Sequence, residues 1–224
     1  MSVKASLAAE GAGGRRSAAA LHRLVAVGAE GVASGTPYMV GSKLLQGWLT
    51  ATGVPISMIG LLSLAELPYT LKLFWAPLLD RWPIPWPDRR RGWLLLLQTL
   101  LAVGIAAMAL LQPHADPRHL ALVGVSAIAL AVVSASQDVM VDAYRTDLMP
   151  QEERGAGAAA GALGYRAAML AVGAGGFVVA GQFGWPAAFV ASAALVAAVL
   201  PISLTAPKLV PLAHPPRRTV RSPR

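Results

Sequence analysis

Cysteine is absent from this chain of 224 residues, and charged residues are scarce, at 13% of the total. The absence of cysteine excludes a disulfide framework and thiolate chemistry. A soluble domain carries about 25% charged residues, whereas this chain is 55% hydrophobic. A compact chain of this length cannot bury that much apolar surface in its own core. We therefore expect lipid to be the solvent for most of the protein.

Long runs without charge show where the chain crosses the bilayer. Residues 92–115 and 167–207 contain no charged side chain, and a hydrocarbon core of about 30 Å is crossed by about 20 helical residues. The second run is long enough for two helices, separated at Gly184 and Pro186. The sequence thus predicts an all-α, polytopic membrane protein with six transmembrane helices. Their predicted ranges are 23–49, 55–79, 92–112, 118–143, 156–181 and 186–205.

Basic residues predict the orientation of the chain. With the N-terminus in the cytoplasm, the cytoplasmic segments hold all of the 19 lysines and arginines except Lys43, Lys72, Arg118 and Arg166. By the positive-inside rule, both termini are then cytoplasmic. The net charge of +8 does not indicate nucleic-acid binding, because the basic residues lie in short loops and tails that flank helices.

Ionisable residues inside the predicted helices are the candidates for a substrate and proton pathway. A charge in hydrocarbon costs at least about 2.5 kcal/mol, so such residues normally face a bundle interior or a watery cavity. The first, second, fourth and fifth predicted helices carry all of them, which favours a cavity lined by these helices. The candidates are Glu30, Lys43, Glu66, Lys72, Asp138, Asp142 and Arg166.

Depth in the bilayer predicts how these residues pair. Counting about 1.5 Å per residue from the helix ends, Glu66 and Arg166 both fall close to the midplane. Lys72, Asp138 and Glu30 fall in the inner half. We therefore expect Glu66 to pair with Arg166, and Lys72 to pair with an acid of the inner half. The residues alone leave two interpretations open: ion pairs that only fix helix packing, or groups that take part in proton or substrate movement.

Two aspartates raise an enzymatic alternative. Asp138 and Asp142 are four residues apart, hence on one face of a helix. Such carboxylates could hold Mg²⁺ and a diphosphate in a membrane-bound transferase. A site of that kind needs more than two ligands, and the nearest further acids are Glu152 and Glu153. This function is the less favoured alternative, and we expect no metal, no cofactor and no enzymatic activity.

Proline and glycine predict local features of the helices. Pro37 and Pro68 lie inside predicted spans, where a missing backbone hydrogen bond kinks a helix. Gly31-x-x-x-Gly35 and Gly157-x-x-x-Gly161 have the small-residue spacing that lets two helices approach closely.

Several segments carry a family resemblance. The most specific is SASQDVMVDAYR at residues 134–145, which EERGAG follows at 152–157. Further matching segments are LPYTLKLFWAPLLDR at 67–81, RRRGW at 89–93 and GYR at 164–166. Together they resemble the AmpG-like muropeptide permeases of the major facilitator superfamily, over about residues 22–207.

This resemblance implies a secondary active transporter in the bacterial inner membrane. Such a permease imports sugar-peptides of the muropeptide kind together with protons. Because these substrates carry carboxylates, Lys72 and Arg166 would be suitable anchors, and an acidic residue would titrate. The lipid bilayer, the sugar-peptide and protons are thus the expected partners.

The resemblance also implies a conformational latch on the cytoplasmic side, formed by Asp80, Arg81, Arg90 and Arg91. These residues would form ion pairs near helix ends, and the pairs would weaken when the cavity opens inward. A plain interfacial role is the open alternative. The chain departs from the family signature in two ways. Ala76 stands where the signature has glycine, and residues 82–88 separate its two parts.

Members of the superfamily have two six-helix halves that face each other across a central site. The six helices predicted for this chain correspond to one half. We expect a cytoplasmic tail at residues 1–22, a six-helix half-transporter at 23–206, and a basic, proline-rich, disordered cytoplasmic tail at 207–224. A lone half would expose its polar lining to lipid, so we expect a second six-helix half or a second copy as a partner. An inactive truncated fragment or an accessory membrane subunit is the alternative.

Overall fold

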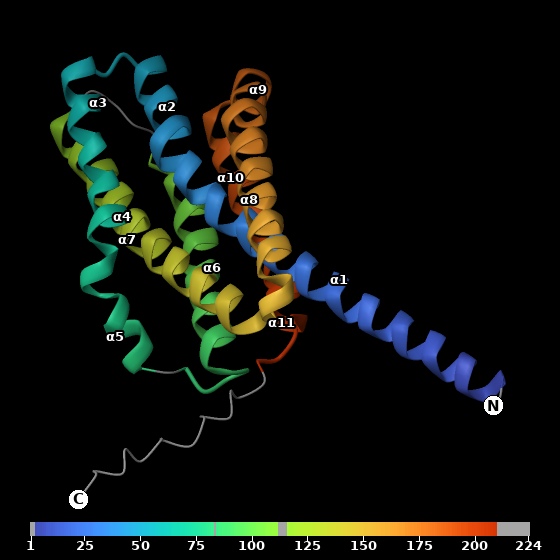
Figure 1. Cartoon of the computed structure of the whole chain (residues 1–224). Helices are drawn as coiled ribbons and strands as arrows, with labels where there is room; N and C mark the ends of the chain where they lie inside the picture. Colours follow the sequence, from blue (N-terminus) through green and yellow to red (C-terminus); the bar gives the residue numbers. More distant parts are fainter. Residues whose placement is uncertain (1–2, 83, 112–115, 210–224) are drawn as a thin grey trace, which may run out of the picture.

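The computed structural model describes residues 3–82, 84–111 and 116–209, which form a bundle of helices (Figure 1). The predicted all-α class is confirmed. The first elements are α1 (Val3–Met39), the wide turn η1 (Val40–Leu44) and α2 (Leu45–Ala51). The elements that follow are α3 (Ile56–Leu62), η2 (Ser63–Glu66), α4 (Leu67–Leu71), η3 (Lys72–Phe74), α5 (Ala76–Arg81), α6 (Arg89–Met108), α7 (Pro117–Leu148), η4 (Gln151–Glu153), α8 (Arg154–Leu170), η5 (Ala171–Gly175), α9 (Gly176–Phe183), α10 (Trp185–Ala197) and α11 (Leu200–Thr205).

In the described part of the chain, five helical segments are long and apolar enough to cross a membrane, and each coincides with a predicted span. The first predicted span, residues 23–49, is not among them, and it contains Glu30 and Lys43. It is nevertheless helical throughout and packs inside the bundle. The five segments are Ile56–Phe74, Arg89–Met108, Arg118–Leu148, Gln151–Phe183 and Trp185–Thr205.

The first helix is longer than the predicted span. It begins at Val3, so most of the predicted tail at residues 1–22 is continuous with it, and this part extends beyond the bundle (Figure 1). Pro37 lies inside α1, and the wide turn η1 follows directly. The backbone is therefore irregular next to the proline, where the missing hydrogen bond was expected to disturb the helix. Of the predicted tail at residues 207–224, positions 210–224 lie outside the described residues.

The second span is divided into short helical pieces. The tighter turns η2 and η3 separate α3, α4 and α5, and Pro68 and Pro77 stand in the first turns of α4 and α5. Proline is accommodated there, because the first turn of a helix leaves its N–H groups unpaired anyway. This span lies at one edge of the bundle (Figure 1). It exposes Ile56, Leu64, Leu67, Leu71, Leu73 and Phe74 to lipid or to another protein.

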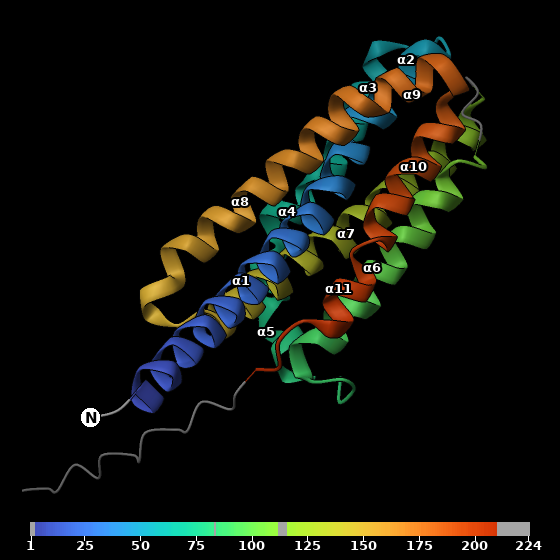
Figure 2. The ribbon, with the colours of Figure 1, turned by 90° about the vertical axis from the view of Figure 1, so that its right-hand side faces the viewer.

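Glycines allow α1 and α8 to pack closely. A methyl group added at Gly31 would collide with the carbonyl oxygen of Gly161, and one at Gly164 would collide with that of Gly28. At Gly35 the added carbon would lie 2.7 Å from a backbone oxygen of α8. Figure 2 shows α8 running along α1, with α10 and α11 running along α6. The predicted close approach is therefore present at Gly31, Gly35 and Gly161, whereas Gly157 faces Met149.

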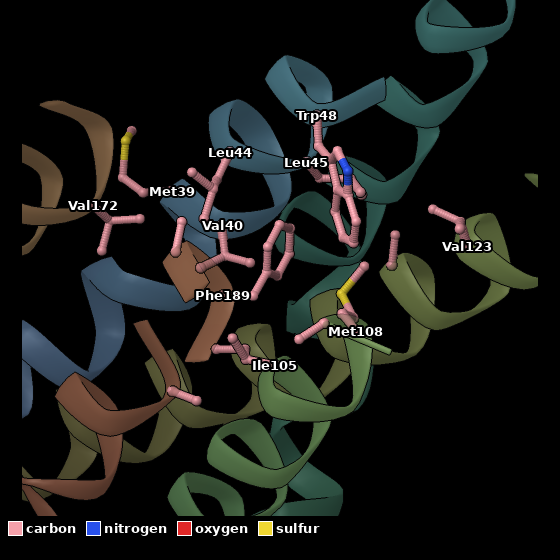
Figure 3. Packing of buried hydrophobic residues seen from close by; sticks show 14 of the residues in the cluster. Met39, Val40, Leu44, Leu45, Trp48, Ile105, Met108, Val123, Val172 and Phe189 are labelled. Atoms are coloured by element: carbon pink, nitrogen blue, oxygen red, sulfur yellow. The ribbon is translucent and has the colours of Figure 1, made fainter. Parts of the chain in front are cut away.

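The main apolar core lies in the half of the bundle that contains α2 (Figure 3). Leu44 and Trp48 from the first span meet Met108 of α6 and Phe189 of α10 there. The rings of Trp48 and Phe189 are 5.0 Å apart. A second, smaller cluster of buried residues contains Ala26, Leu94, Leu97, Met140, Val141, Tyr144 and Ala206.

The α1–α8 contact makes a testable prediction about stability. Gly164→Ala is expected to lower the free energy of unfolding by about 1–3 kcal/mol, because the added methyl group forces two backbones apart. Gly155→Ala, in the same helix, is the matched control, since nothing lies within 4 Å of its added carbon. Thermal unfolding in detergent measures both variants. Equal melting temperatures for the two would contradict the packing described here.

Candidate functional site

Asp138 on α7 is the centre of a polar site where three spans meet. Its Oδ2 atom lies 3.4 Å from Nζ of Lys72, and the hydroxyl of Ser34 on α1 donates to Oδ1. The Lys72 and Asp138 side chains are 27% and 19% exposed, so the pair is largely but not wholly buried. The structure therefore forms the ion pair expected between Lys72 and an acid of the inner half.

A groove of about 410 Å³ lies between α1, α7 and α8. Asp142, Arg145 and Arg166 line it, and Nη2 of Arg145 lies 2.9 Å from Oδ1 of Asp142. Ser34 also lines the groove. Because Ser34 donates to Asp138, the groove and the Lys72–Asp138 pair form one connected polar region.

Three tyrosines separate this groove from a second cavity. Tyr165 lines the groove, whereas Tyr38 and Tyr69 line the second cavity together with Glu66. The Tyr38 ring stands edge-on to Tyr69 at 5.5 Å and lies 6.3 Å from the ring of Tyr165. The three rings thus form an aromatic partition with Tyr38 in its middle.

The expected pair of Glu66 and Arg166 is not formed. Within the described residues neither side chain has an ion-pair partner, and the two line different cavities. The reason lies in the packing, because α8 makes its main contacts with α1 and Glu66 belongs to the span at the edge of the bundle.

Two further candidates line neither cavity. Lys43 is exposed on the wide turn η1. Glu30 is buried and hydrogen-bonded to Gln98 and Ser203. The expectation that all of the ionisable residues in the spans face one shared cavity is therefore wrong.

Two of the four predicted latch residues, Asp80 and Arg90, belong to one ion-paired group. Arg90 contacts the carboxylate of Asp80, and its Nε lies 3.0 Å from Oδ2 of Asp147 on α7. Arg89 donates from Nη2 to the backbone oxygen of Asp80 at 2.5 Å. This group ties α5, at the end of the second span, and the start of α6 to the end of α7. Arg81 is exposed and forms no ion pair with any described residue.

Arg91 belongs to a separate arrangement. It is buried and pairs with Asp88 at 2.5 Å, and Asp88 also caps α6 by accepting from the backbone N–H of Arg91. Its Nη1 donates to the carbonyl oxygens of Leu204 and Ala206 at 3.1 and 2.7 Å. Arg91 therefore holds the end of α11 against α6 instead of joining the Asp80 group.

Some long-range contacts had no signal in the sequence. Asp147 was not predicted to join the latch, and Arg23 on α1 pairs with Glu153 at 2.6 Å. The hydroxyl of Tyr144 donates to the backbone oxygen of Pro207 at 3.1 Å. These contacts join residues that are far apart in the chain, so no local sequence pattern predicts them.

The two aspartates on α7 have different partners. Asp138 accepts from Ser34 and Lys72, whereas Asp142 pairs with Arg145. In the part of the chain that the structure describes, no three histidine or acidic side chains come together in a way that could hold a metal ion. Chemically, the region offers a carboxylate that can take up a proton, and cations that can bind an anionic group.

Comparison with known proteins shows what the chain is similar to. The sequence profile of the Major Facilitator Superfamily matches residues 27–223. The anhydromuropeptide permease of Escherichia coli strain K12 is 43% identical over 179 residues, which cover 80% of this chain and 36% of that permease. A Rickettsia felis protein named as a candidate transporter, AmpG 4, is 34% identical over 196 residues, covering 84% of this chain and 47% of that protein. The chain thus spans about a third to a half of the length of the curated relatives it matches.

The Lys72–Asp138 pair makes a prediction that needs no transport assay. Lys72→Met or Asp138→Asn alone is expected to lower the free energy of unfolding by about 1–3 kcal/mol, because each leaves a partly buried partner unpaired. The double variant should lose less than the sum of the two, since the residues interact directly. Unfolding in detergent measures this cycle, with Lys43→Met as the exposed control. Strict additivity would show that the pair contributes nothing.

Proposed function

Because the chain belongs to the Major Facilitator Superfamily, as the N-terminal half of an AmpG-like permease, we propose that it forms half of a proton-coupled importer of muropeptide-like sugar-peptides. The family and the named relatives are transporters and not enzymes. The helices make the chain a multi-pass membrane protein. One observation carries the proposal for this chain: a proton-accepting carboxylate, Asp138, is paired with a cation, Lys72, beside a polar groove.

The pair offers a way to couple a proton to the substrate. While Asp138 is ionised, it attracts the ammonium group of Lys72. Protonation of Asp138 removes that attraction and frees Lys72. Lys72 then joins Arg166, which has no ion-pair partner among the described residues, in binding carboxylates of the sugar-peptide. Proton uptake and substrate binding therefore favour each other.

The groove is open on one side of this half. Asp142 is 62% exposed although it lies in a spanning helix, and lipid is a poor environment for such a group. A second six-helix half, or a second copy of this chain, would close the groove and supply its opposite wall. This proposal agrees with the third to half of the relatives' length that the chain spans.

We place the protein in the bacterial inner membrane with both termini in the cytoplasm. The basic loops support this orientation through the positive-inside rule. The group of Asp80, Arg90 and Asp147 then lies at the cytoplasmic end. There it acts as the latch, because the Arg90 pairs join the second span to α7 and must loosen when these helices separate.

Reconstituted uptake tests the proposal. The chain is co-expressed with a C-terminal six-helix half of the same family, and accumulation of a labelled anhydromuropeptide is followed in vesicles with and without a proton gradient. We expect accumulation only with the gradient and with both halves. Equal accumulation with and without the proton gradient would disprove proton coupling. No uptake under any condition would favour the inactive fragment or accessory subunit.

Variants then separate the two roles in the pair. Asp138→Asn should abolish gradient-driven accumulation but allow labelled and unlabelled substrate to exchange, because the proton acceptor is lost and the groove remains. Lys72→Met should weaken substrate affinity roughly tenfold or more, as the loss of a charge-assisted hydrogen bond does. Lys43→Met, whose exposed side chain lines neither cavity, is the control and should behave like the wild type.

A further inference from the structure

Three buried polar side chains from three spans meet at Glu30. Gln98 on α6 donates from Nε2 to Oε2 of Glu30 at 2.7 Å, and the Ser203 hydroxyl on α11 lies 2.7 Å from Oε1. The same hydroxyl lies 3.0 Å from Oε1 of Gln98, which closes a ring. Glu30, Gln98 and Ser203 are 1%, 0% and 1% exposed. Figure 2 shows α11 beside α6 and near α1, the three helices that carry these side chains.

The ring contains three polar contacts, and each needs one hydrogen. Ser203 supplies a single hydrogen, and the amide nitrogen of Gln98 directs one into the ring. An ionised Glu30 supplies none, so one contact would join two oxygens with no hydrogen between them. Exchanging the amide oxygen and nitrogen of Gln98 leaves the count unchanged. The carbonyl oxygen of Val199 lies 3.2 Å from the Ser203 hydroxyl and competes for the same hydrogen. With an ionised Glu30, the hydrogens would therefore be still fewer than the contacts that need them.

A proton on Glu30 completes the ring. The acid O–H then donates to the Ser203 oxygen, Ser203 donates to Oε1 of Gln98, and the Gln98 amide donates to Oε2 of Glu30. Every oxygen in the ring has a hydrogen-bond partner in this arrangement, as buried polar groups normally do.

Among the described residues, no cation pairs with Glu30. It forms no ion pair within the described residues, and α11 carries no titratable side chain. Tyr144 on α7 is close enough to be influenced by Glu30 electrostatically. The titratable groups on the surrounding helices have other partners: Arg23 pairs with Glu153, Arg91 pairs with Asp88, and Tyr144 donates to Pro207. An ionised carboxylate here would be buried and unpaired, which is strongly unfavourable.

We infer that Glu30 binds a proton and keeps it, so that the neutral acid links α1, α6 and α11 outside the transport pathway. The proton cannot leave without breaking the ring and burying a charge. Glu30 therefore differs in role from Asp138, which is partly exposed and paired with Lys72. This assignment concerns the protonation of the chain itself and stands independently of any transported substrate.

Stability of two Glu30 variants tests the inference. Glu30→Gln places an amide N–H where the acid O–H donated and keeps the accepting oxygen, so its melting temperature should match the wild type. Glu30→Ala removes both groups, leaves Gln98 and Ser203 unpaired, and should lower the melting temperature by roughly 2–10 °C. A Glu30→Gln variant that melts as low as Glu30→Ala would overturn the inference.

Infrared spectroscopy of the full chain provides a second measurement, which holds even if Glu30→Ala does not fold. We expect the carbonyl absorption of a protonated carboxyl group in the wild type, unchanged between mildly acidic and mildly alkaline pH and missing in Glu30→Gln. Asp138→Asn is the matched control and should keep this absorption. Identical spectra for the wild type and Glu30→Gln in this region, or a band that titrates away, would show that Glu30 is ionised.

Discussion

Hydrocarbon does not solvate charge, and this constraint governs where the polar side chains of the bundle lie. The bundle accommodates its buried carboxyl groups in two ways. Asp138 keeps a cation and a hydroxyl as partners at the edge of a groove. Glu30 lies in a closed ring of neutral donors and acceptors. The first arrangement leaves a group that can change its protonation, and the second removes one from exchange.

The first helix brings these arrangements together. Glu30, Ser34 and Tyr38 follow one another at intervals of four residues, so they form a stripe along α1. Glu30 belongs to the ring, Ser34 donates to Asp138 of the ion pair, and Tyr38 belongs to the aromatic partition. The adjacent face carries Gly31 and Gly35, against which α8 packs. Because the glycines let α8 approach, Tyr165 reaches Tyr38 and the groove gains its third wall.

The predicted architecture came from properties that depend only on local sequence. Charge-free runs located the spans, and Pro37 and Pro68 marked irregular backbone. Depth in the bilayer predicted Asp138 or Glu30 as the partner of Lys72, and the structure pairs Lys72 with Asp138. Depth in the bilayer wrongly predicted a pair of Glu66 and Arg166. Two residues at the same depth can still face different neighbours, as these two do.

Rotation about each helix axis depends on which helices pack together, and a single sequence does not specify that arrangement. The same limit applies to the partners of Glu30, since Gln98 and Ser203 are uncharged and charge pairing does not predict them. Polar residues without charge are the signal that would have found this ring. They are rare enough in spans three and six to be examined one by one.

Arg91 and Tyr144 have a consequence for whatever follows α11. Both side chains are buried, and they bind the carbonyl oxygens of Leu204, Ala206 and Pro207. The polypeptide thus leaves the bundle from a fixed point and in a fixed direction, anchored to the third and fourth spans. A residue joined after Pro207 therefore starts from a position that the third and fourth spans set.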